Sequence, residues 1–148
     1  MRLRGRVVPG FGEGKKFFSI GQYLAEFEKI LGKKPFSGTL NLDVGKENIG
    51  QVEMAERDAR VCVEGFEIGG KKYGEVKCVR AKITFDGGKR QEGKNAQGRV
   101  MGVEGFLVFP EINKHPKNIV EFACSENLRE KFGLKDGNWA EIRILPDI

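Results

Sequence analysis

Two oxygen-bearing side chains, Thr39 and Asn41, stand two residues apart in a stretch that alternates polar and apolar residues. On a β-strand such residues project from the same face, about 7 Å apart, so they can share one ligand. Hydroxyl and amide oxygens are hard donors that Mg²⁺ accepts while it keeps waters and substrate phosphates in its shell. The pair therefore fits either a magnesium site completed by a nucleotide or an ordinary polar strand face.

A glycine-rich segment follows the first predicted strand and runs Gly10-Phe11-Gly12-Glu13-Gly14-Lys15-Lys16. Glycines let consecutive backbone N–H groups converge on a phosphate, because no Cβ stands in the way. The segment is not a Walker A loop, since Pro9 stands where its first glycine is required and Phe17 where its hydroxyl is required. The glycine spacing does not match the Rossmann fingerprint either. A phosphate cradle and a plain structural turn both remain open.

Two further side chains, Glu121 and Arg129, are candidates for binding rather than for covalent catalysis. His115 is the only histidine, which excludes a multi-histidine metal site and leaves no reason to assign it a catalytic role. Glu121 lies among apolar residues and is either a surface glutamate or a carboxylate that accepts a hydrogen bond from a ligand. Arg129 is either solvated or in reach of a phosphate or a base edge. The sequence identifies no general base.

Composition narrows the class of protein. A chain of 148 residues that is 39% hydrophobic fits one domain over residues 1–148. No apolar run approaches the roughly 18 residues that a membrane span needs, and no signal peptide is legible, so we expect a cytoplasmic protein with no membrane partner. The net charge of +5 favours anionic partners in general.

The numbers of cysteines and glycines indicate the state of the thiols and the class of fold. Cys62, Cys78 and Cys124 are odd in number and form no C-x-x-C pair, so reduced, buried thiols are expected. The chain holds 21 glycines and five prolines, which indicates many tight turns between short strands. We therefore predict a mostly β fold: a small closed β-barrel with one main helix and one short helix.

The first half of the chain is predicted to contain the main helix. Residues 3–8 read as a strand, and Ser19 can cap a helix whose apolar residues recur at helical spacing until Gly32. A strand is expected over 39–44 and a charged surface loop over 45–58. A strand over 59–63 and a hairpin over 66–73, turning at Gly69-Gly70, follow.

The second half is predicted to contain the remaining strands. A bent or broken strand is expected over 73–85, a flexible insertion over 86–99, and further strands over 100–109 and 119–123 on either side of a basic loop. Ser125 can cap a short helix that Gly133 closes, and Asp136-Gly137 turns the chain into a last strand.

Taken together, three sets of motifs resemble the archaeal-type CTP-dependent riboflavin kinase family. They are Gly10-Phe11-Gly12-Glu13-Gly14-Lys15 with Phe18-Ser19; Leu31-Gly32 with Pro35-Phe36-Ser37-Gly38-Thr39-Leu40-Asn41-Leu42; and Val120-Glu121 with Leu128-Arg129-Glu130, Leu134 and Asp136-Gly137. The resemblance runs from about Arg4 to Ile144 and is weakest across 43–60 and 86–99.

This resemblance implies a cradle-loop barrel that phosphorylates riboflavin at its 5′-hydroxyl, giving FMN and CDP from CTP with Mg²⁺. The metal would be held by Thr39 and Asn41, and the flavin by Asn113 and Glu121, although the family usually has threonine where Asn113 stands. The nucleotide would be bound by Gly10, Phe11, Gly12, Glu13, Gly14 and Lys15 and by Asn127, Leu128, Arg129 and Glu130.

Such chemistry requires alignment and charge neutralisation more than a dedicated base. A monomer is expected. The alternatives are a non-catalytic nucleic-acid- or nucleotide-binding barrel and a flavin- or nucleotide-binding regulator without kinase activity. A nucleic-acid partner is not expected, because the basic residues are dispersed along the chain at 71–72, 89–90 and 114–117.

Overall fold

Six strands close into a barrel in the computed structural model, which describes residues 1–10, 20–36, 38–86, 102–111 and 116–146. Around the barrel the order is β6-β7-β8-β2-β1-β9, and a β6–β9 pairing closes the ring, while β3 adds to the outer edge of β6. All of these pairings are antiparallel. The predicted mostly β, closed barrel is confirmed.

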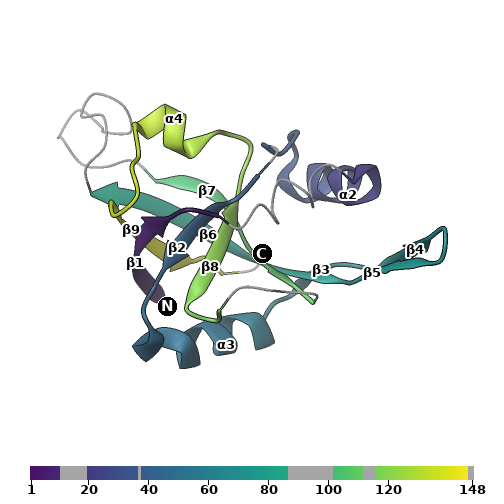
Figure 1. Cartoon of the computed structure of the whole chain (residues 1–148), viewed down its shortest axis with the longest axis horizontal. Helices are drawn as coiled ribbons and strands as arrows, with labels where there is room; N and C mark the ends of the chain where they lie inside the picture. The colour runs from purple at the N-terminus through teal and green to yellow at the C-terminus, as the bar shows by residue number, and fades with distance from the viewer. Residues whose placement is uncertain (11–19, 37, 87–101, 112–115, 147–148) are drawn as a thin grey trace.

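The elements follow one another along the chain in an order that mixes barrel strands with short helices (Figure 1). Their bounds are β1 Arg2–Val8, α2 Gly21–Leu31, β2 Leu40–Asp43, η1 Lys46–Asn48, α3 Ile49–Arg57, β3 Val61–Val63, β4 Phe66–Ile68, β5 Lys71–Tyr73, β6 Val76–Asp86, β7 Val103–Pro110, β8 Ile119–Ala123, α4 Leu128–Phe132 and β9 Trp139–Ile144.

The interior of the barrel is filled by the alternate residues of its strands. In β1, Leu3 and Val7 are buried while Arg2, Arg4 and Arg6 are exposed, which is the period of two that a strand with one wet face requires. The same alternation brings large apolar side chains of β2, β6, β7, β8 and β9 into one cluster. Inward and outward positions are therefore set by the sequence, strand by strand.

The segment 45–58, predicted to be a surface loop, is instead a short 3₁₀ turn followed by helix α3. Val52 and Ala55 of α3 are buried in the same cluster as the barrel interior, and Figure 1 shows α3 across the lower end of the barrel. Leu128 and Phe132 of α4 join the same cluster at the other end. The prediction failed because three spaced apolar residues among charged ones give a weak pattern.

A second core lies outside the barrel, beneath α2. Tyr23 and Phe27 of this helix pack with Val63, Cys78 and Val108, which lie on β3, β6 and β7. The helix ends at Gly32 in a left-handed conformation, as its glycine predicts. Its N-terminal residue is preceded by Ile20, and the predicted cap Ser19 lies outside the described residues. Helix α2 thus covers the outer face of the strands it contacts.

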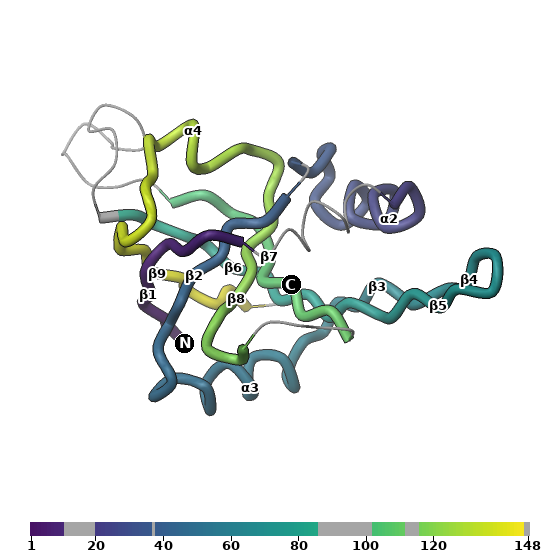
Figure 2. The backbone as a smooth tube through the Cα atoms, in the orientation of Figure 1, coloured from purple at the N-terminus to yellow at the C-terminus, as the bar shows by residue number. Residues whose placement is uncertain are grey.

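Strands β4 and β5 form the predicted hairpin, which extends away from the barrel as an arm (Figure 2). Gly69 and Gly70 both have positive φ (57° and 80°), as a two-residue hairpin turn demands. At the base of the arm, Phe66 stacks on Tyr73 and meets Tyr23 edge-on, with ring centroids 4.9 and 4.7 Å apart. The Tyr23 hydroxyl donates to the carbonyl oxygen of Gly74. These contacts tie the arm to α2.

Two smaller expectations are wrong and a third is confirmed. The strand expected over 73–85 is broken, as predicted, because β5 ends at Tyr73 and β6 runs from Val76 to Asp86. Helix α4 is capped by Asn127, whose side chain accepts from the backbone N–H of Glu130, and not by Ser125. Cys62 is exposed, whereas Cys78 and Cys124 are buried as expected. Most of the predicted insertion 86–99 lies outside the described residues.

No helix among the described residues is both long and apolar enough to cross a membrane.

Candidate functional site

The β2–β8 pairing brings the strand residues of the candidate metal and flavin sites together. Asn41 on β2 stands directly opposite Glu121 on β8, and on its other side it pairs with Val8 of β1. Both side chains are buried, with 6% and 5% of their surface exposed. They are the buried polar or charged residues of the described chain. Of the two alternatives for Glu121, the surface glutamate is therefore wrong.

Thr39 joins this pair from the segment just before β2. Its hydroxyl donates a hydrogen bond to Glu121 Oε1, with 2.9 Å between the oxygens. The sequence had linked Thr39 to Asn41, but nothing in the spacing indicated that Glu121, 82 residues later, would meet them. The residues proposed for the metal and one residue proposed for the flavin are therefore parts of one site, which we call the Thr39–Asn41–Glu121 cluster.

Asn41 is the unusual member of this cluster. Its side-chain amide makes no hydrogen bond to the described residues, and none of their fully buried side-chain nitrogen or oxygen atoms lacks a partner, so the amide of this largely buried residue still reaches the surface. An amide in that position can donate to or accept from a ligand. The described residues contain no group of three His, Cys, Asp or Glu side chains placed to hold a metal. A cation held by Thr39 and Asn41 would therefore have two neutral protein ligands, with the single carboxylate of Glu121 beside them, and would need further charge from a bound ligand.

A second network fixes the far end of the same two strands. The Asp43 carboxylate accepts hydrogen bonds from the backbone N–H of Gly45 and from the Asn118 side chain, both at 2.9 Å. Because Asp43 ends β2 and Asn118 precedes β8, these bonds hold the register that sets Asn41 opposite Glu121. No local sequence pattern signals this pair, because Asp43 and Asn118 are 75 residues apart along the chain.

The Asp43 network predicts a pH dependence of stability. The Asn118 side chain, followed by the Gly45 N–H, lowers the pKa of Asp43 below its ordinary value of about 4. A carboxyl whose pKa is lowered by folding stabilises the protein above its unfolded pKa, and this contribution is lost as the pH falls through the folded pKa. The melting temperature of Asp43→Asn should therefore fall less than that of the wild type between about pH 5 and pH 2.

The matched control is Asp58→Asn, because Asp58 is exposed at the end of α3. Thermal melts at a series of pH values measure the effect. If Asp43→Asn and Asp58→Asn follow the same acid profile as the wild type, the Asp43 bonds add nothing to stability.

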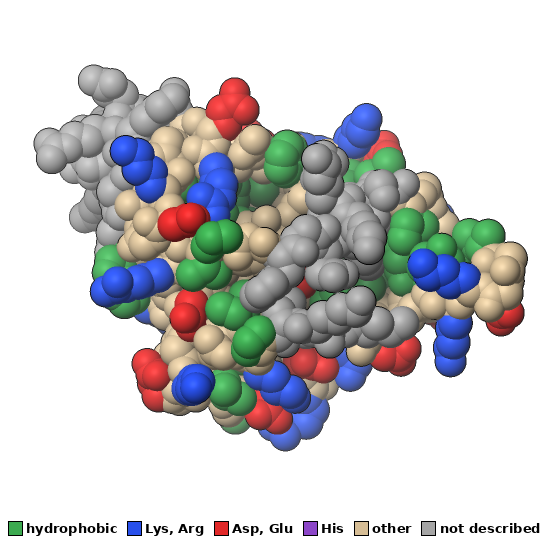
Figure 3. All heavy atoms as spheres, viewed as in Figure 1, with side chains coloured by type: hydrophobic (Ala, Val, Ile, Leu, Met, Phe, Trp, Pro, Cys, Tyr) green, Lys and Arg blue, Asp and Glu red, His purple; other side chains and the backbone are tan. Residues whose placement is uncertain are grey.

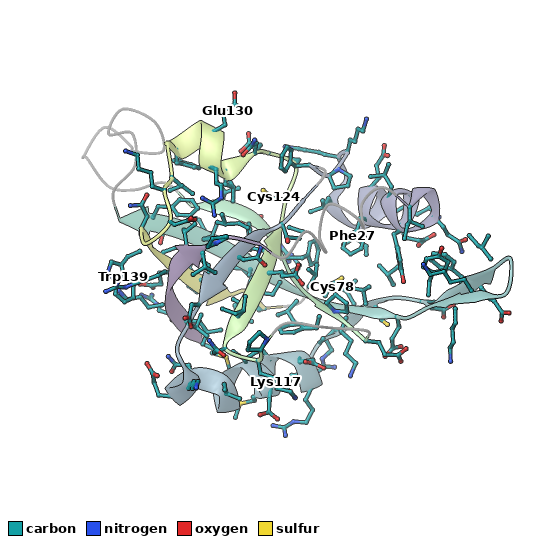
Figure 4. All side chains as sticks on the ribbon, viewed as in Figure 1. Phe27, Cys78, Lys117, Cys124, Glu130 and Trp139 are labelled. Carbon is teal, nitrogen blue, oxygen red and sulfur yellow. The ribbon has the colours of Figure 1, made fainter. Side chains whose placement is uncertain are left out.

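Helix α4 carries the four residues proposed for the nucleotide, and they point in different directions. Asn127 caps the helix, Leu128 is buried, and Glu130 points away from the barrel (Figure 4). Arg129 reaches back to β1: its Nη2 donates to the carbonyl oxygen of Val8 at 3.0 Å and to Asp136 Oδ1 at 2.7 Å. Arg129 therefore joins α4 to the strand that leads directly into Pro9 and Gly10.

An open pocket connects α4 to the cluster. Its walls include Thr39, Phe36, Phe122, Asn127 and Arg129. Phe36 keeps 38% of its surface exposed, so an apolar ring and several hydrogen-bonding groups face the same space. The pocket is much smaller than a typical ligand cavity, so it can take the edge of a flat, polar ring rather than a whole ligand. The sequence motifs include Phe36 without indicating a role for it. They also do not indicate that Asp136 is a partner of Arg129.

Several predicted site residues cannot be placed. Phe11, Gly12, Glu13, Gly14, Lys15 and Asn113 lie outside the described residues, as does His115. Gly10 is described, and it stands two residues after Val8, the β1 residue that pairs with Asn41. The chain thus reaches Gly10 beside the cluster, from a strand end that Arg129 contacts.

Comparison with known proteins identifies the family of this chain. A family model named for CTP-dependent riboflavin kinases, with the description "domain of unknown function DUF120", matches residues 7–144. The riboflavin kinases of Archaeoglobus fulgidus and Pyrobaculum arsenaticum are 30% and 35% identical over 98% of this chain, which covers 55% and 61% of their lengths. The chain thus spans less than two thirds of these two relatives.

A third relative matches along nearly the whole of both chains. The riboflavin kinase of Methanococcus aeolicus is 31% identical over 97% of this chain and 98% of its own. The family match includes the end of β1, the cluster and α4. The chain therefore belongs to the CTP-dependent riboflavin kinase family.

Proposed function

We propose that this protein is a riboflavin kinase, which transfers the terminal phosphoryl group of CTP to the 5′-hydroxyl of riboflavin to give FMN and CDP. The observation that carries the proposal is the Thr39–Asn41–Glu121 cluster, buried on the barrel beside the start of the glycine segment. Family membership and the names of the relatives support the same activity.

The nucleotide is proposed to lie between the glycine segment and α4. Backbone N–H groups of Gly10 to Lys15 would cradle its phosphates, and Asn127 to Glu130 would line its other side. The open pocket beside Phe36 and Arg129 supports this position, because it leads from α4 to Thr39. CTP as the donor rests on the family name and not on a base contact.

The residues of the cluster fit a magnesium ion. Thr39 and Asn41 would hold it through their hydroxyl and amide oxygens, and this role is supported by the largely buried Asn41, whose amide reaches the surface and makes no hydrogen bond to the described residues. When bound, Mg²⁺ would neutralise the negative charge that develops on the transferring phosphoryl group. With only neutral protein ligands the ion would bind weakly without nucleotide, since the phosphates supply the anionic oxygens.

Glu121 is proposed to orient the acceptor. Its Oε1 already accepts a hydrogen bond from Thr39, which fixes the carboxylate in one direction on the outer face of β8. A fixed acceptor can bind a hydroxyl or a ring N–H of riboflavin and so direct the 5′-hydroxyl toward the phosphorus. Alignment of this kind supplies much of the rate enhancement in phosphoryl transfer. Asn113 is proposed as a second flavin contact.

The test of the proposed function is product formation. The purified protein is incubated with riboflavin, Mg²⁺ and either CTP or ATP, and FMN is separated by liquid chromatography. FMN should form with CTP and much more slowly with ATP. Riboflavin that stays unchanged with every nucleotide would contradict the proposal and leave a binding module or a regulator without kinase activity.

Arg129→Ala is expected to weaken CDP binding by about 10- to 100-fold, because a charge-assisted hydrogen bond contributes about 1.5 to 3 kcal/mol. The substitution removes the contacts with Val8 and Asp136 that hold α4 against the end of β1. Riboflavin affinity should change less than twofold. Titration calorimetry with each ligand measures both values.

Lys131→Ala is the matched control, because it removes a cation from the same helix that pairs only with Glu126 among the ion pairs described. Its CDP affinity should stay close to that of the wild type. Equal CDP affinity in Arg129→Ala and Lys131→Ala would show that Arg129 has no part in nucleotide binding.

The cytoplasmic location, the monomeric state and the single domain over residues 1–148 stay predictions.

A further inference from the structure

The outer face of β1, β9 and β6 gathers cations that are scattered along the sequence. We call it the cationic face, and its members are Arg2, Arg4, Arg6, Lys82, Trp139 and Arg143. In Figure 3, Lys and Arg side chains stand at the left edge of the molecule, over β1 and β9. The face lies on strands other than β2 and β8, which carry the Thr39–Asn41–Glu121 cluster.

The strand register sets like charges directly opposite one another. Arg2 on β1 stands opposite Arg143 on β9, and Arg143 stands opposite Lys82 on β6. Like charges in this relation repel and destabilise a sheet. Glu141 lies in the middle of this face, opposite Arg4 in the register, and pairs with Arg2 at 3.2 Å, so its carboxylate offsets part of the repulsion. A row of three cations across three strands is a costly arrangement that a bound polyanion would relieve.

The same face also carries an exposed aromatic ring. Trp139 keeps 37% of its surface exposed and points away from the barrel (Figure 4). The guanidinium carbons of Arg6 and Arg4 lie 4.6 and 5.1 Å from its ring centroid. Stacking uses the face of the Arg6 guanidinium, and the N–H groups at its edge can still donate to a phosphate.

The spacing of these groups fits a phosphodiester chain. Arg2, Arg4 and Arg6 follow one another at intervals of two residues, about 7 Å along a strand. Arginine is the side chain best suited to phosphate because its fork can bind two oxygens. Asp43, Asp86 and Glu104 stand opposite Arg6, Trp139 and Lys82 in the strand register, and they mark the borders of the face.

We propose that the cationic face binds single-stranded nucleic acid, with phosphates along the arginine rows and a base against Trp139. A single strand is the partner because its bases are free to stack on an exposed ring, whereas a duplex keeps them paired. The basic residues considered from the sequence were others: Lys71 and Lys72 lie on the arm, and Lys117 pairs with Glu53 at 3.8 Å. The fold, and not the sequence order, assembles this surface.

Trp139 is the only tryptophan of the chain, so its fluorescence reports this face alone. The full chain is titrated with a 15-nucleotide oligothymidine at low salt, and quenching gives the affinity. The test variant is Arg2→Gln/Arg4→Gln/Arg143→Gln. The matched control is Lys33→Gln/Lys71→Gln/Lys72→Gln, which removes the same charge from α2's end and the arm.

The wild type and the control should bind with similar affinity, and the test variant at least tenfold more weakly. The logarithm of the affinity should fall with the logarithm of salt concentration with a slope of about −2 to −3, as expected for three or four phosphate contacts. FMN formation should be unchanged in the test variant, because the face lies outside the proposed kinase site.

Four results would overturn the inference. They are the absence of quenching, equal weakening in both triple variants, equal affinity for a duplex of the same sequence, and equal affinity for polyglutamate of similar charge. The last would identify the face as a surface for acidic polypeptides. None of these results bears on whether riboflavin is phosphorylated, so the two proposals fail separately.

Discussion

Asn41→Ala is expected to lower the rate of FMN formation by about 100-fold, equivalent to about 2.7 kcal/mol of transition-state stabilisation. The substitution removes an oxygen from the place where Thr39, Glu121 and the end of β1 meet. Steady-state kinetics with CTP and riboflavin measure it. The amide makes no hydrogen bond to the described residues and is not fully buried, so its loss should cost the fold little.

Thermal melts separate a metal role from a structural one. Mg²⁺ and CDP together should raise the melting temperature of the wild type more than the sum of their separate effects, because ligands of the native state stabilise it by mass action. Asn41→Ala should lose this synergy. The control is Gln51→Ala, on the exposed side of α3. Near-normal turnover with unchanged synergy in Asn41→Ala would mean that Asn41 is only a strand residue.

Phe27→Ala is expected to destabilise the protein by about 3 to 5 kcal/mol, the usual cost of deleting a buried aromatic ring. Phe27 is fully buried between α2 and the outside of the barrel, where it packs in the second core (Figure 4). Denaturant unfolding at equilibrium measures the change in free energy. The loss should appear as a lower transition midpoint.

Phe27→Leu is the control, because it keeps most of the apolar volume and should cost much less. Hydrogen exchange in α2 should rise in Phe27→Ala more than exchange in β1, which belongs to the barrel cluster. A loss of less than about 1 kcal/mol in Phe27→Ala would contradict the account of α2 as part of a shared core.

The barrel strands could be predicted because their local patterns are strong. Residues 3–8 and 119–123 correspond to β1 and β8 within one residue, since alternation or a continuous apolar run is legible without tertiary information. Gly69-Gly70 predicted the hairpin turn and Gly133 predicted the helix end, because these positions require positive φ. Helix α2 was predictable from its apolar spacing.

The errors arose where tertiary contacts decide. Helix α3 has few apolar residues and is stabilised by packing Val52 and Ala55 against the barrel, which no local pattern announces. The choice of Asn127 over Ser125 as the cap depends on where α4 begins to pack, since both residue types can cap a helix.

The candidate site, too, could be predicted only in part from the sequence. Thr39 and Asn41 could be paired from sequence because two-residue spacing on a strand places them on one face. Their meeting with Glu121 could not, because it requires the β2–β8 pairing, and the approach of Arg129 to Val8 spans 121 residues. Residue types therefore indicated the chemistry, while the barrel closure decided which of them share a site.

The most direct test of the central claim is the transfer of label from the terminal phosphate of CTP. The protein is given riboflavin, Mg²⁺, CTP labelled in its γ-phosphate and an equal concentration of unlabelled ATP, and the label in FMN is counted after chromatography. The account predicts that FMN carries nearly one label per molecule and that Asn41→Ala yields about 100-fold less in the same time. Unlabelled FMN, or label found only in inorganic phosphate, would contradict it.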